Sequence, residues 1–248
     1  REIAQKLNLS LRRKGISILT QVRVESLRES PGGVLVVLSS GQEFSASKAL
    51  VSVGRKPNSQ DLGIEALGVR LERGRVLVDA HMRTSVPDIY AIGDVVSKFQ
   101  LAHTASYEGI VAAKNIAGKT TEADYKAVPN CVYTDPEISC VGLSENEAGK
   151  TGFEVKTVRF PYSALGKAHA VSRTDGMVKL VGDKKTNRIL GLHIIGADAA
   201  NLIAEAVLAI KKGLTVEELA ETIHAHPTLS EGLMEACHVF NGMGIHVL

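Results

Sequence analysis

The sequence lacks a charge surplus, an apolar run of membrane length and a cysteine framework, and each absence excludes a class of protein. Its 29 Lys and Arg residues oppose 27 Asp and Glu residues, and the basic ones are scattered, so nothing points to nucleic acid or an anionic membrane. The longest apolar-rich stretch, residues 199–210, is shorter than a bilayer crossing and is interrupted by Asn201 and Glu205. We therefore expect a globular protein without a membrane span.

The three cysteines, Cys131, Cys140 and Cys237, are too few for a disulfide scaffold, and none has metal-ligand spacing. We expect small buried side chains in a reducing compartment such as the cytoplasm. The first residues carry neither a starting Met nor a charged-then-apolar leader. They are typical of a helix interior, so we interpret the N-terminus as a cut.

The first half of the chain alternates short strand patterns with turns. Apolar periodicity predicts a helix through Ile3, Leu7 and Leu11, which Gly15 ends. We expect strands at 16–25, 34–38, around 43–44 and at 49–53. Residues 58–79 are turn-rich, with a short helix at 61–67. A buried strand at 89–92 and an apolar-faced helix at 104–117 follow. This pattern predicts the closing part of an α/β unit and a crossover between domains.

Beyond about Pro129 the pattern changes, which indicates a second domain. Residues 177–181 and 189–195 are predicted strands, joined by a polar turn at 183–187. Three helices are expected at 198–212, 215–222 and 230–240. Strands followed by helices predict an α+β domain, with helices on one face of an antiparallel sheet.

Residues 84–94, TSVPDIYAIGD, place a carboxylate at the end of an apolar segment. Gly93 allows a ligand to approach the backbone, and Asp94 could accept a hydrogen bond from a sugar or ribityl hydroxyl. Residues 51–58, VSVGRKPN, likewise end a predicted strand at Gly54, where backbone could approach a nucleotide. Both stretches are also compatible with simple turns that need no ligand.

Residues 224–231, HAHPTLSE, allow two interpretations. Thr228 and Glu231 have the spacing of a capping box that opens the last helix, which requires no chemistry. Alternatively, Glu231 accepts a hydrogen bond from the imidazole of His226, which precedes Pro227, and fixes its tautomer. A histidine oriented by a carboxylate can act as a general base near neutral pH.

These runs resemble motifs of the pyridine nucleotide-disulfide oxidoreductase family. Residues 84–94 match its second flavin motif, which implies that Asp94 binds the ribityl chain of FAD. The stretch that contacts the flavin ring corresponds to Gln100, Leu101, Ala102 and His103, with Gln100 where Met is usual. Residues 51–58 resemble its second dinucleotide-side signature, which places Gly54, and less directly Val22, beside NAD.

Residues 224–231 agree residue for residue with the dihydrolipoamide dehydrogenase branch of the family. The resemblance implies that His226 takes a proton from the thiol substrate and that Glu231 orients it, whereas His224 packs nearby. Glutathione reductases share part of this run, but Ala225 and Leu229 favour the dihydrolipoamide branch. Mercuric reductases carry a terminal Cys pair instead of this His.

The resemblance covers essentially the whole chain and implies three parts: residues 1–57 from an NAD-binding domain, 58–128 from an FAD-binding domain and 129–248 as a dimerisation domain. The implied fold class is an α/β remnant of a flavoprotein with two dinucleotide-binding domains, plus an α+β dimerisation domain. The family's two glycine-rich fingerprints and its Cys-x-x-x-x-Cys pair are not in this sequence.

We therefore interpret the chain as the C-terminal half of an FAD- and NAD-dependent dihydrolipoamide dehydrogenase, a homodimer acting on a small thiol such as lipoamide. Alone, it is expected to be inactive and to hold no stable FAD. The alternatives are a catalytically silent dimerisation fragment and a disulfide reductase with another thiol substrate. The choice between NAD and NADP cannot be read from these residues.

Overall fold

A computed structural model describes residues 2–96 and 99–246. The chain divides into two compact units, one made of residues 1–18 and 125–248 and the other of residues 19–124. We describe each unit by itself. The domain boundaries predicted at 57/58 and 128/129 stay predictions. The two compact units are defined by contacts within this chain and not by the domains of the family.

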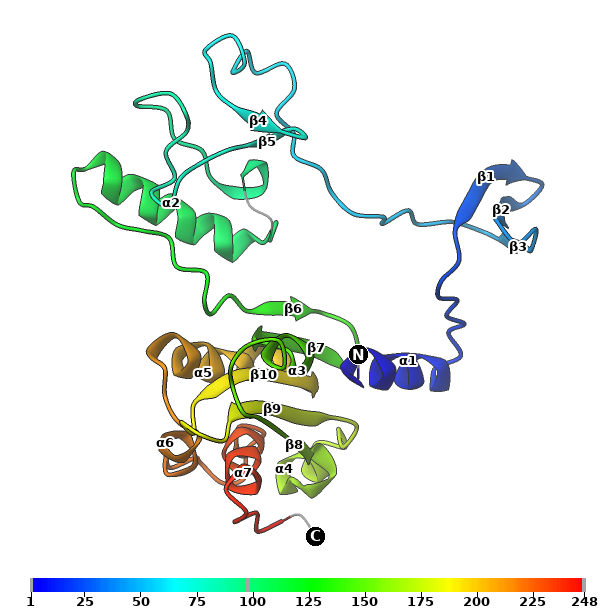
Figure 1. Ribbon diagram of the computed structural model, residues 1–248. Coiled ribbons are helices and arrows are strands. Elements are labelled where there is room, and N and C mark those ends of the chain that lie inside the picture. Colours follow the sequence, from blue (N-terminus) through cyan, green and yellow to red (C-terminus); the bar gives the residue numbers. More distant parts are fainter. Residues whose placement is uncertain (1, 97–98, 247–248) are drawn as a thin grey trace. The chain divides into compact units, whose positions relative to one another are not determined.

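A five-stranded antiparallel sheet forms the centre of the first unit, in the strand order β6-β7-β10-β9-β8 (Figure 1). The strands are β6 (Asn130–Val132), β7 (Glu137–Gly142), β8 (Val155–Pro161), β9 (Met177–Asp183) and β10 (Ile189–Gly196). Short helices lie in its connections: α3 (Glu145–Ala148), η2 (Tyr162–Ala164) and α4 (Gly166–Ala170). The predicted strands at 177–181 and 189–195 are confirmed as β9 and β10.

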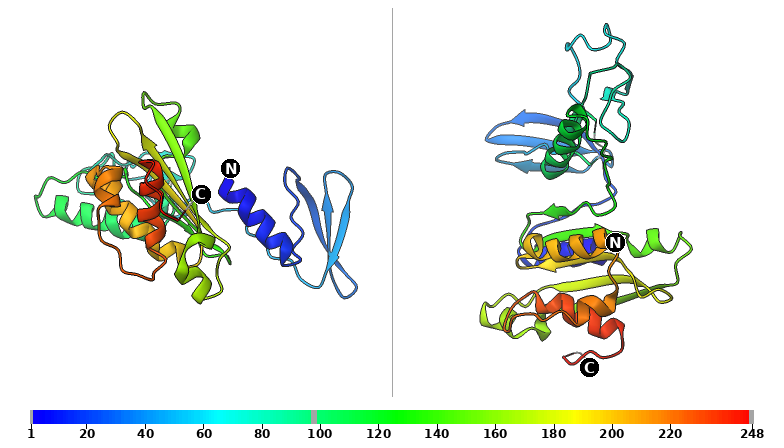
Figure 2. Two further views of the ribbon diagram at one scale, coloured as in Figure 1. Left: turned by 90° about the horizontal axis from the view of Figure 1, so that it is seen from below. Right: turned by 90° about the vertical axis from the view of Figure 1, so that its left-hand side faces the viewer.

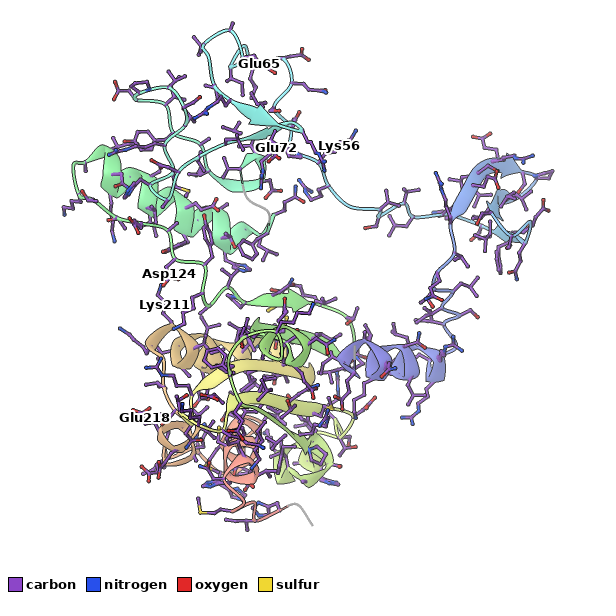
Figure 3. The ribbon with its side chains drawn as sticks, viewed as in Figure 1. Lys56, Glu65, Glu72, Asp124, Lys211 and Glu218 are labelled. Atoms are coloured by element: carbon purple, nitrogen blue, oxygen red, sulfur yellow. The ribbon has the colours of Figure 1, made fainter. Side chains whose placement is uncertain are left out.

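Three helices follow the sheet, as predicted. They are α5 (Ala199–Lys212), α6 (Val216–Ala220) and α7 (Glu231–Phe240), shown in orange to red in Figures 1 and 2. α5 packs on β7 and β10, and α7 packs on β8 and β9. The start of α6 is a full capping box, in which the Glu218 carboxylate accepts from the Thr215 N–H at 2.7 Å. Glu218 is labelled among the side chains in Figure 3.

Directly opposed residues build the core between the sheet and these helices. Leu192 of β10 faces Val141 on one side and Leu180 on the other, and Ile194 faces Val178. Phe160 of β8 is also opposite Val178. Period-two alternation puts these side chains on one face, where they are fully or nearly fully buried against α5 and α7. The predicted α+β arrangement is thereby confirmed.

The turn between β9 and β10 is built around Asp183, which is buried at its start. Its carboxylate accepts hydrogen bonds from the N–H groups of Glu154 and Thr186 and from the Thr186 hydroxyl. Asn187 takes the left-handed conformation, with φ of 57°, that tight turns require. Hydrogen bonds to the carboxylate, the Thr186 hydroxyl foremost, outweigh burial and lower the pKa of Asp183.

Asp183→Asn is expected to destabilise the first unit in a pH-dependent way. Because the folded-state pKa is lowered, the contribution of the carboxylate is complete above its ordinary pKa of 3.8 and is lost as the pH falls through the lowered value. Urea unfolding of parent and variant between pH 7 and pH 2 should show a free-energy difference that shrinks in acid. A difference that is constant over this range would contradict the assignment.

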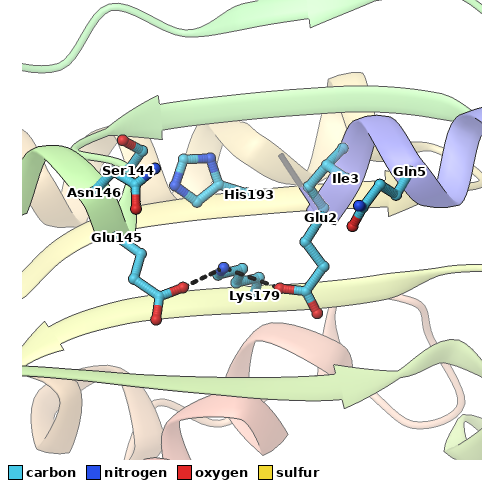
Figure 4. Close-up of a pocket in the computed structure, with 8 residues that line it drawn as sticks. All are labelled: Glu2, Ile3, Gln5, Ser144, Glu145, Asn146, Lys179 and His193. Carbon is cyan, nitrogen blue, oxygen red and sulfur yellow. Dashed lines mark hydrogen bonds and ion pairs between the residues drawn. The ribbon is translucent and has the colours of Figure 1, made fainter.

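Helix α1 (Glu2–Arg13) lies with the other face of the same sheet, and its predicted position is confirmed. Lys179 of β9 is only 8% exposed and binds two carboxylates, Glu2 at 3.0 Å and Glu145 at 2.7 Å (Figure 4). Hydrogen bonding from Arg159, together with Lys179, lowers the pKa of Glu2 to about 2 despite partial burial. These ion pairs explain why residues 1–18 group with the C-terminal unit.

The second unit contains a three-stranded antiparallel ribbon and a helical part. The ribbon strands are β1 (Val24–Ser30), β2 (Gly33–Leu38) and β3 (Glu43–Ala46). Further along lie the two-residue strands β4 (Leu71–Glu72) and β5 (Arg75–Val76), the single turn η1 (Gly93–Val95) and helix α2 (Ala102–Ile116). The strands predicted at 34–38 and 43–44 and the helix predicted at 104–117 are confirmed.

Four predicted elements of this unit are wrong. Of the strand predicted at 16–25, only Val24 and Glu25 lie in a strand, β1, and 49–53 is extended coil in which Leu50 and Val53 are each 93% exposed. Residues 61–67 form turns rather than a helix, and 89–92 contributes only an isolated bridge between Tyr90 and Arg83. A strand persists only when neighbouring strands satisfy its backbone groups, and no described strand lies beside 49–53.

Candidate functional site

The first candidate site is the loop between α6 and α7, which carries His226 just before the last helix. The Nδ1 atom of His226 lies 2.8 Å from Oε1 of Glu231, the first residue of α7. The other oxygen, Oε2, accepts from the N–H of Thr228 at 2.7 Å. One carboxylate therefore serves both interpretations of the motif: it orients the imidazole and it binds the backbone at the helix start.

The full capping box predicted at Thr228 does not form. The N-cap of α7 is Ser230, which has no side-chain cap, and the Thr228 hydroxyl instead donates to the Ala225 carbonyl at 2.7 Å. The helix begins later than a cap at Thr228 would allow. Glu231 is consequently at the first helical position rather than the third, which leaves its Oε1 available to His226.

Exposure differs sharply between the two members of this pair, which we call the dyad. The side chain of His226 is 75% exposed, whereas that of Glu231 is 15% exposed. A carboxylate accepts hydrogen bonds, so Nδ1 of the neutral imidazole carries the proton and Nε2 is the basic nitrogen toward solvent. The dyad can therefore take a proton from a group that approaches from outside.

Electrostatics keep Glu231 in the form this arrangement needs. Burial works to raise the pKa of its carboxyl, but the hydrogen bonds from the Thr228 N–H and from His226 outweigh burial, and the pKa is lowered. The charges of His226 and His246 act in the same direction. An ionised Glu231 is the acceptor that fixes the imidazole.

His224 has the packing role that the sequence suggests. Its side chain is 5% exposed, with Nδ1 2.8 Å from the Thr222 carbonyl and Nε2 3.0 Å from Oε1 of Glu205 on α5. These contacts tie the loop that bears His226 to the helix layer. Glu205 was not predicted, and only its position on the helix preceding this loop could have indicated it.

The cysteines supply no nucleophile to this site. Burial, with Glu205 nearby, raises the pKa of the Cys237 thiol to about 12, and burial also raises the pKa values of Cys131 and Cys140. Thiols with raised pKa values stay protonated and unreactive near neutral pH.

The second candidate site lies in the other unit, where η1 and the start of α2 meet. Gly93 has φ of +76°, and a Cβ there would lie 3.3 Å from the Ala105 side chain. The Gly93 N–H donates to the buried Glu108 carboxylate of α2 at 2.7 Å. This bond fixes the turn that carries Asp94 against the helix.

Asp94 is 40% exposed, and its Oδ2 accepts from the more exposed Arg55 at 3.2 Å. Leu101, the N-cap of α2, provides no side-chain cap, and the Thr104 hydroxyl is buried without a hydrogen-bond partner within the described part of the chain. Gln100, with φ of 50°, Leu101, Ala102 and His103 form this helix entry. An accessible carboxylate beside an uncapped helix N-terminus fits a hydroxylated chain and a polar ring edge, as in FAD.

The structure does not bring together the residues, Gly54 and Val22, that the resemblance places beside NAD. Gly54, with φ of +113°, lies in the extended coil after 49–53, and a Cβ there would meet nothing within 4 Å. Val22 is 46% exposed and lies outside any strand. Neither residue has the sheet that would position it beside a dinucleotide.

Comparison with known proteins identifies the class to which this fold and these motifs belong. The family described as pyridine nucleotide-disulphide oxidoreductase matches residues 1–109, and its dimerisation domain matches residues 128–237. The chain therefore belongs to the pyridine nucleotide-disulphide oxidoreductase family. The predicted fold class, an α/β remnant with an α+β dimerisation domain, is confirmed.

Among curated proteins, the chain is similar to dihydrolipoyl dehydrogenases. It is 45% identical to that of Thermus scotoductus and 44% identical to that of Geobacillus stearothermophilus, covering all of this chain and 55% and 54% of those relatives. It thus spans about half the length of the curated relatives it matches.

Solved structures show the same fold. LpdA from Mycobacterium tuberculosis is 29% identical, with a TM-score of 0.89 over 96% of this chain and 52% of its own. The HOCl-induced flavoprotein disulfide reductase RclA from Escherichia coli is 28% identical, with a TM-score of 0.88 over 94% of this chain and 54% of its own. No helix in residues 2–96 and 99–246 has the length and apolar character of a membrane span.

Proposed function

We propose that this chain is the C-terminal half of an FAD-dependent dihydrolipoyl dehydrogenase, which oxidises a small dithiol such as dihydrolipoamide and reduces NAD. The observation that carries the proposal is the dyad: an exposed imidazole whose Nδ1 lies 2.8 Å from a largely buried carboxylate. Named relatives at 44–45% identity support the choice of substrate.

In this proposal, Nε2 of His226 removes a proton from the substrate thiol, and Glu231 stabilises the imidazolium that forms. The thiolate then attacks a redox disulfide that the other half of the protein is proposed to supply, because the Cys-x-x-x-x-Cys pair of the family is not in this sequence. When bound, FAD would supply the two-electron redox chemistry that couples thiol oxidation to NAD. His226 later returns its proton to the leaving sulfur or to solvent.

Asp94 is proposed to accept a hydrogen bond from the ribityl chain of FAD, and residues Gln100 to His103 to lie along the flavin ring. Gly54 and Val22 are proposed to lie beside NAD once the 49–53 segment joins a sheet. This chain alone is proposed to hold neither cofactor and to be inactive, because the phosphate-binding loops of the family are not in its sequence.

A homodimer through the C-terminal unit is part of the proposal. The match to a dimerisation domain supports it, as do Ile223, which is 97% exposed beside the dyad, and Leu208 of α5, which is 58% exposed. In the dimer, His226 is proposed to act on the disulfide of the partner subunit. A cytoplasmic location is proposed from the cysteine usage alone.

A chimera tests the proposal directly. The N-terminal half of the Geobacillus stearothermophilus relative would be joined to this chain at the start of the alignment, and the chain alone would be the comparison. We expect the chimera to bind flavin, which its absorbance would show, and to reduce NAD with dihydrolipoamide. The chain alone is expected to do neither. Flavin binding without turnover on dihydrolipoamide would reject lipoamide as substrate, and other disulfides, including those that RclA-like reductases accept, would then be assayed.

The natural polypeptide provides a second test. If the intact mass of the protein from its source corresponds to these 248 residues alone, the chain is a catalytically silent dimerisation fragment and the enzyme proposal is wrong. A mass near that of the relatives, of which this chain covers 54–55%, supports it.

Glu231→Gln is expected to slow dithiol oxidation by about 10- to 100-fold, because the imidazole loses a charge-assisted hydrogen bond worth about 1.5–3 kcal/mol. The amide can still accept from the Thr228 N–H, so α7 keeps its start. Steady-state rates of the chimera measure the effect. Glu218→Gln, which alters the capping box of α6 instead, is the matched control, and an equal loss in both variants would indicate damage to the helix layer rather than to the dyad.

A further inference from the structure

A second imidazole–carboxylate pair lies one helical turn from the dyad. The Nδ1 atom of His246 is 2.7 Å from Oε1 of Glu235. Glu235 follows Glu231 by four residues in α7, so the two carboxylates lie on the same face of the helix, one turn apart. Each of them accepts from the Nδ1 of one histidine.

Glu235 is the more deeply buried of the two carboxylates. Its side chain is 3% exposed, whereas the His246 ring is 59% exposed. Within the described part of the chain, the second oxygen of Glu235, Oε2, is buried without a hydrogen-bond partner. A buried carboxylate is costly without a partner, so the bond from His246 stabilises Glu235 in its buried position. The contact with His246 is therefore a strong constraint on the chain that bears it.

The segment 241–246 reverses direction to make this contact. Gly242, with φ of +75°, turns the chain after α7, and the Met243 N–H donates to the His238 carbonyl at 2.8 Å. Gly244 lies against Val239, whose Cγ2 would be 2.8 Å from any added Cβ, so only glycine allows this approach. The segment thus runs back along α7 and brings His246 to the level of Glu235.

We propose that the segment 241–246 is a positioning element for the dyad, in which His246, anchored on Glu235, supports the first turn of α7 and keeps Glu231 aimed at His226. This inference rests on the proposed function of the dyad and adds a positioning residue to it. His246 touches neither the reacting thiol nor His226 in this role and acts through α7.

The charges around α7 are consistent with this role. His226 and His246 both act on Glu231 and lower the pKa of its carboxyl. Lys156 of β8 lies at the far end of the helix, 4.8 Å from the centre of the Phe240 ring. Glu205 of α5 faces His224 and acts on Cys237 rather than on Glu231. Among the described groups, His246 is the side chain, besides His226, that acts on Glu231 and lowers the pKa of its carboxyl.

Removal of His246 has a defined electrostatic consequence. His246→Gln leaves the Glu235 carboxylate without its imidazole, one turn from Glu231. Without the hydrogen bond from His246, the negative charge of Glu235 is less well compensated one turn from Glu231 and favours a protonated His226, so the base becomes available only at higher pH. The acid limb of dithiol oxidation is therefore expected to move to higher pH, with a rate about threefold lower on that limb, the effect of a partly exposed charge pair.

The experiment compares three variants of the complete, flavin-loaded protein or chimera. His246→Gln should move the acid limb to higher pH, and the double variant Glu235→Gln/His246→Gln should return it toward the parent profile, because no unpaired buried charge remains. The double variant also remains informative if the single variant fails to fold. Ile245→Ala, which changes an exposed neighbour in the same segment and leaves the pair intact, should keep the parent profile.

Nuclear magnetic resonance of ¹⁵N-histidine-labelled protein separates this inference from the proposed function. The titration midpoint of the His226 ring should rise in His246→Gln and recover in the double variant, whether or not the protein oxidises dithiols. Coincident midpoints in parent and His246→Gln, or an equal change in Ile245→Ala, would overturn the positioning role. A shifted midpoint in a protein without dithiol turnover would instead refute only the proposed function.

Discussion

His226→Gln is expected to slow dithiol oxidation by about 10²- to 10⁴-fold in the flavin-loaded chimera or complete protein, the range that general-base catalysis contributes. Glutamine keeps a polar group of similar reach but has no nitrogen that can take up a proton at neutral pH. The thiol must then ionise unaided, and only its small thiolate fraction reacts.

Flavin content should be unchanged in this variant, because the residues proposed to contact FAD belong to the other unit of the chain. Stopped-flow absorbance of flavin reduction by dihydrolipoamide gives the rate of the half-reaction that needs the base. Raising the pH should partly restore this rate, since more of the substrate is then already thiolate. His169→Gln, an exposed imidazole of the same unit whose Nε2 lies 2.8 Å from the Ser163 carbonyl, is the matched control. A His226→Gln protein that reacts at the parental rate would refute the base assignment.

Phe160→Ala is expected to lower the free energy of unfolding of the C-terminal unit by about 3–5 kcal/mol. Phe160 is fully buried on the β8 strand, directly opposite Val178, and its ring fills the layer between the sheet and the helices. Truncation removes its transfer energy and leaves a cavity, because a close-packed interior relaxes only partly.

Urea unfolding followed by far-ultraviolet circular dichroism measures this change. Phe153→Ala is the matched control, because that ring is 42% exposed and its loss should change stability little. If both variants lost stability equally, the sheet face assigned to the core would be wrong. Because α7 begins with Glu231 and packs on β8 and β9, Phe160→Ala should also loosen the dyad and reduce turnover at elevated temperature.

The sequence patterns predicted β9, β10 and the three last helices of the C-terminal unit, because each of these has a local signal that agrees with its final environment, but they missed β6, β7 and β8. The apolar run 189–195, the Asp183 to Asn187 turn and the apolar face of α5 all correspond to observed structure. The same patterns failed at 49–53 and 89–92, where apolar residues predicted strands. Strand formation depends on neighbours that supply hydrogen bonds, and a local pattern carries no information about them.

The candidate site likewise has a part that the sequence predicted and a part that it did not. Residue order alone was enough to single out His226 and Glu231 and to relate the run to a family. It left open whether Glu231 caps the helix or orients the imidazole, and the folded chain shows that its two oxygens do both. His246 and Glu235 lie 11 residues apart and have no motif spacing, so only the reversal of the chain at Gly242 reveals them as a pair.

What the sequence determined by itself was therefore local: two strands and the helices α1, α5, α6 and α7 of the C-terminal unit, the loop that carries the imidazole and the family to which the chain belongs. What only the tertiary structure decided was the pairing of groups distant along the chain, namely His224 with Glu205, His246 with Glu235 and Lys179 with Glu2 and Glu145. Hydrogen bonds and ion pairs act over about 3 Å, and periodicity reports only which face of an element is apolar. Which groups on two different elements come within this distance is decided only by how the chain folds.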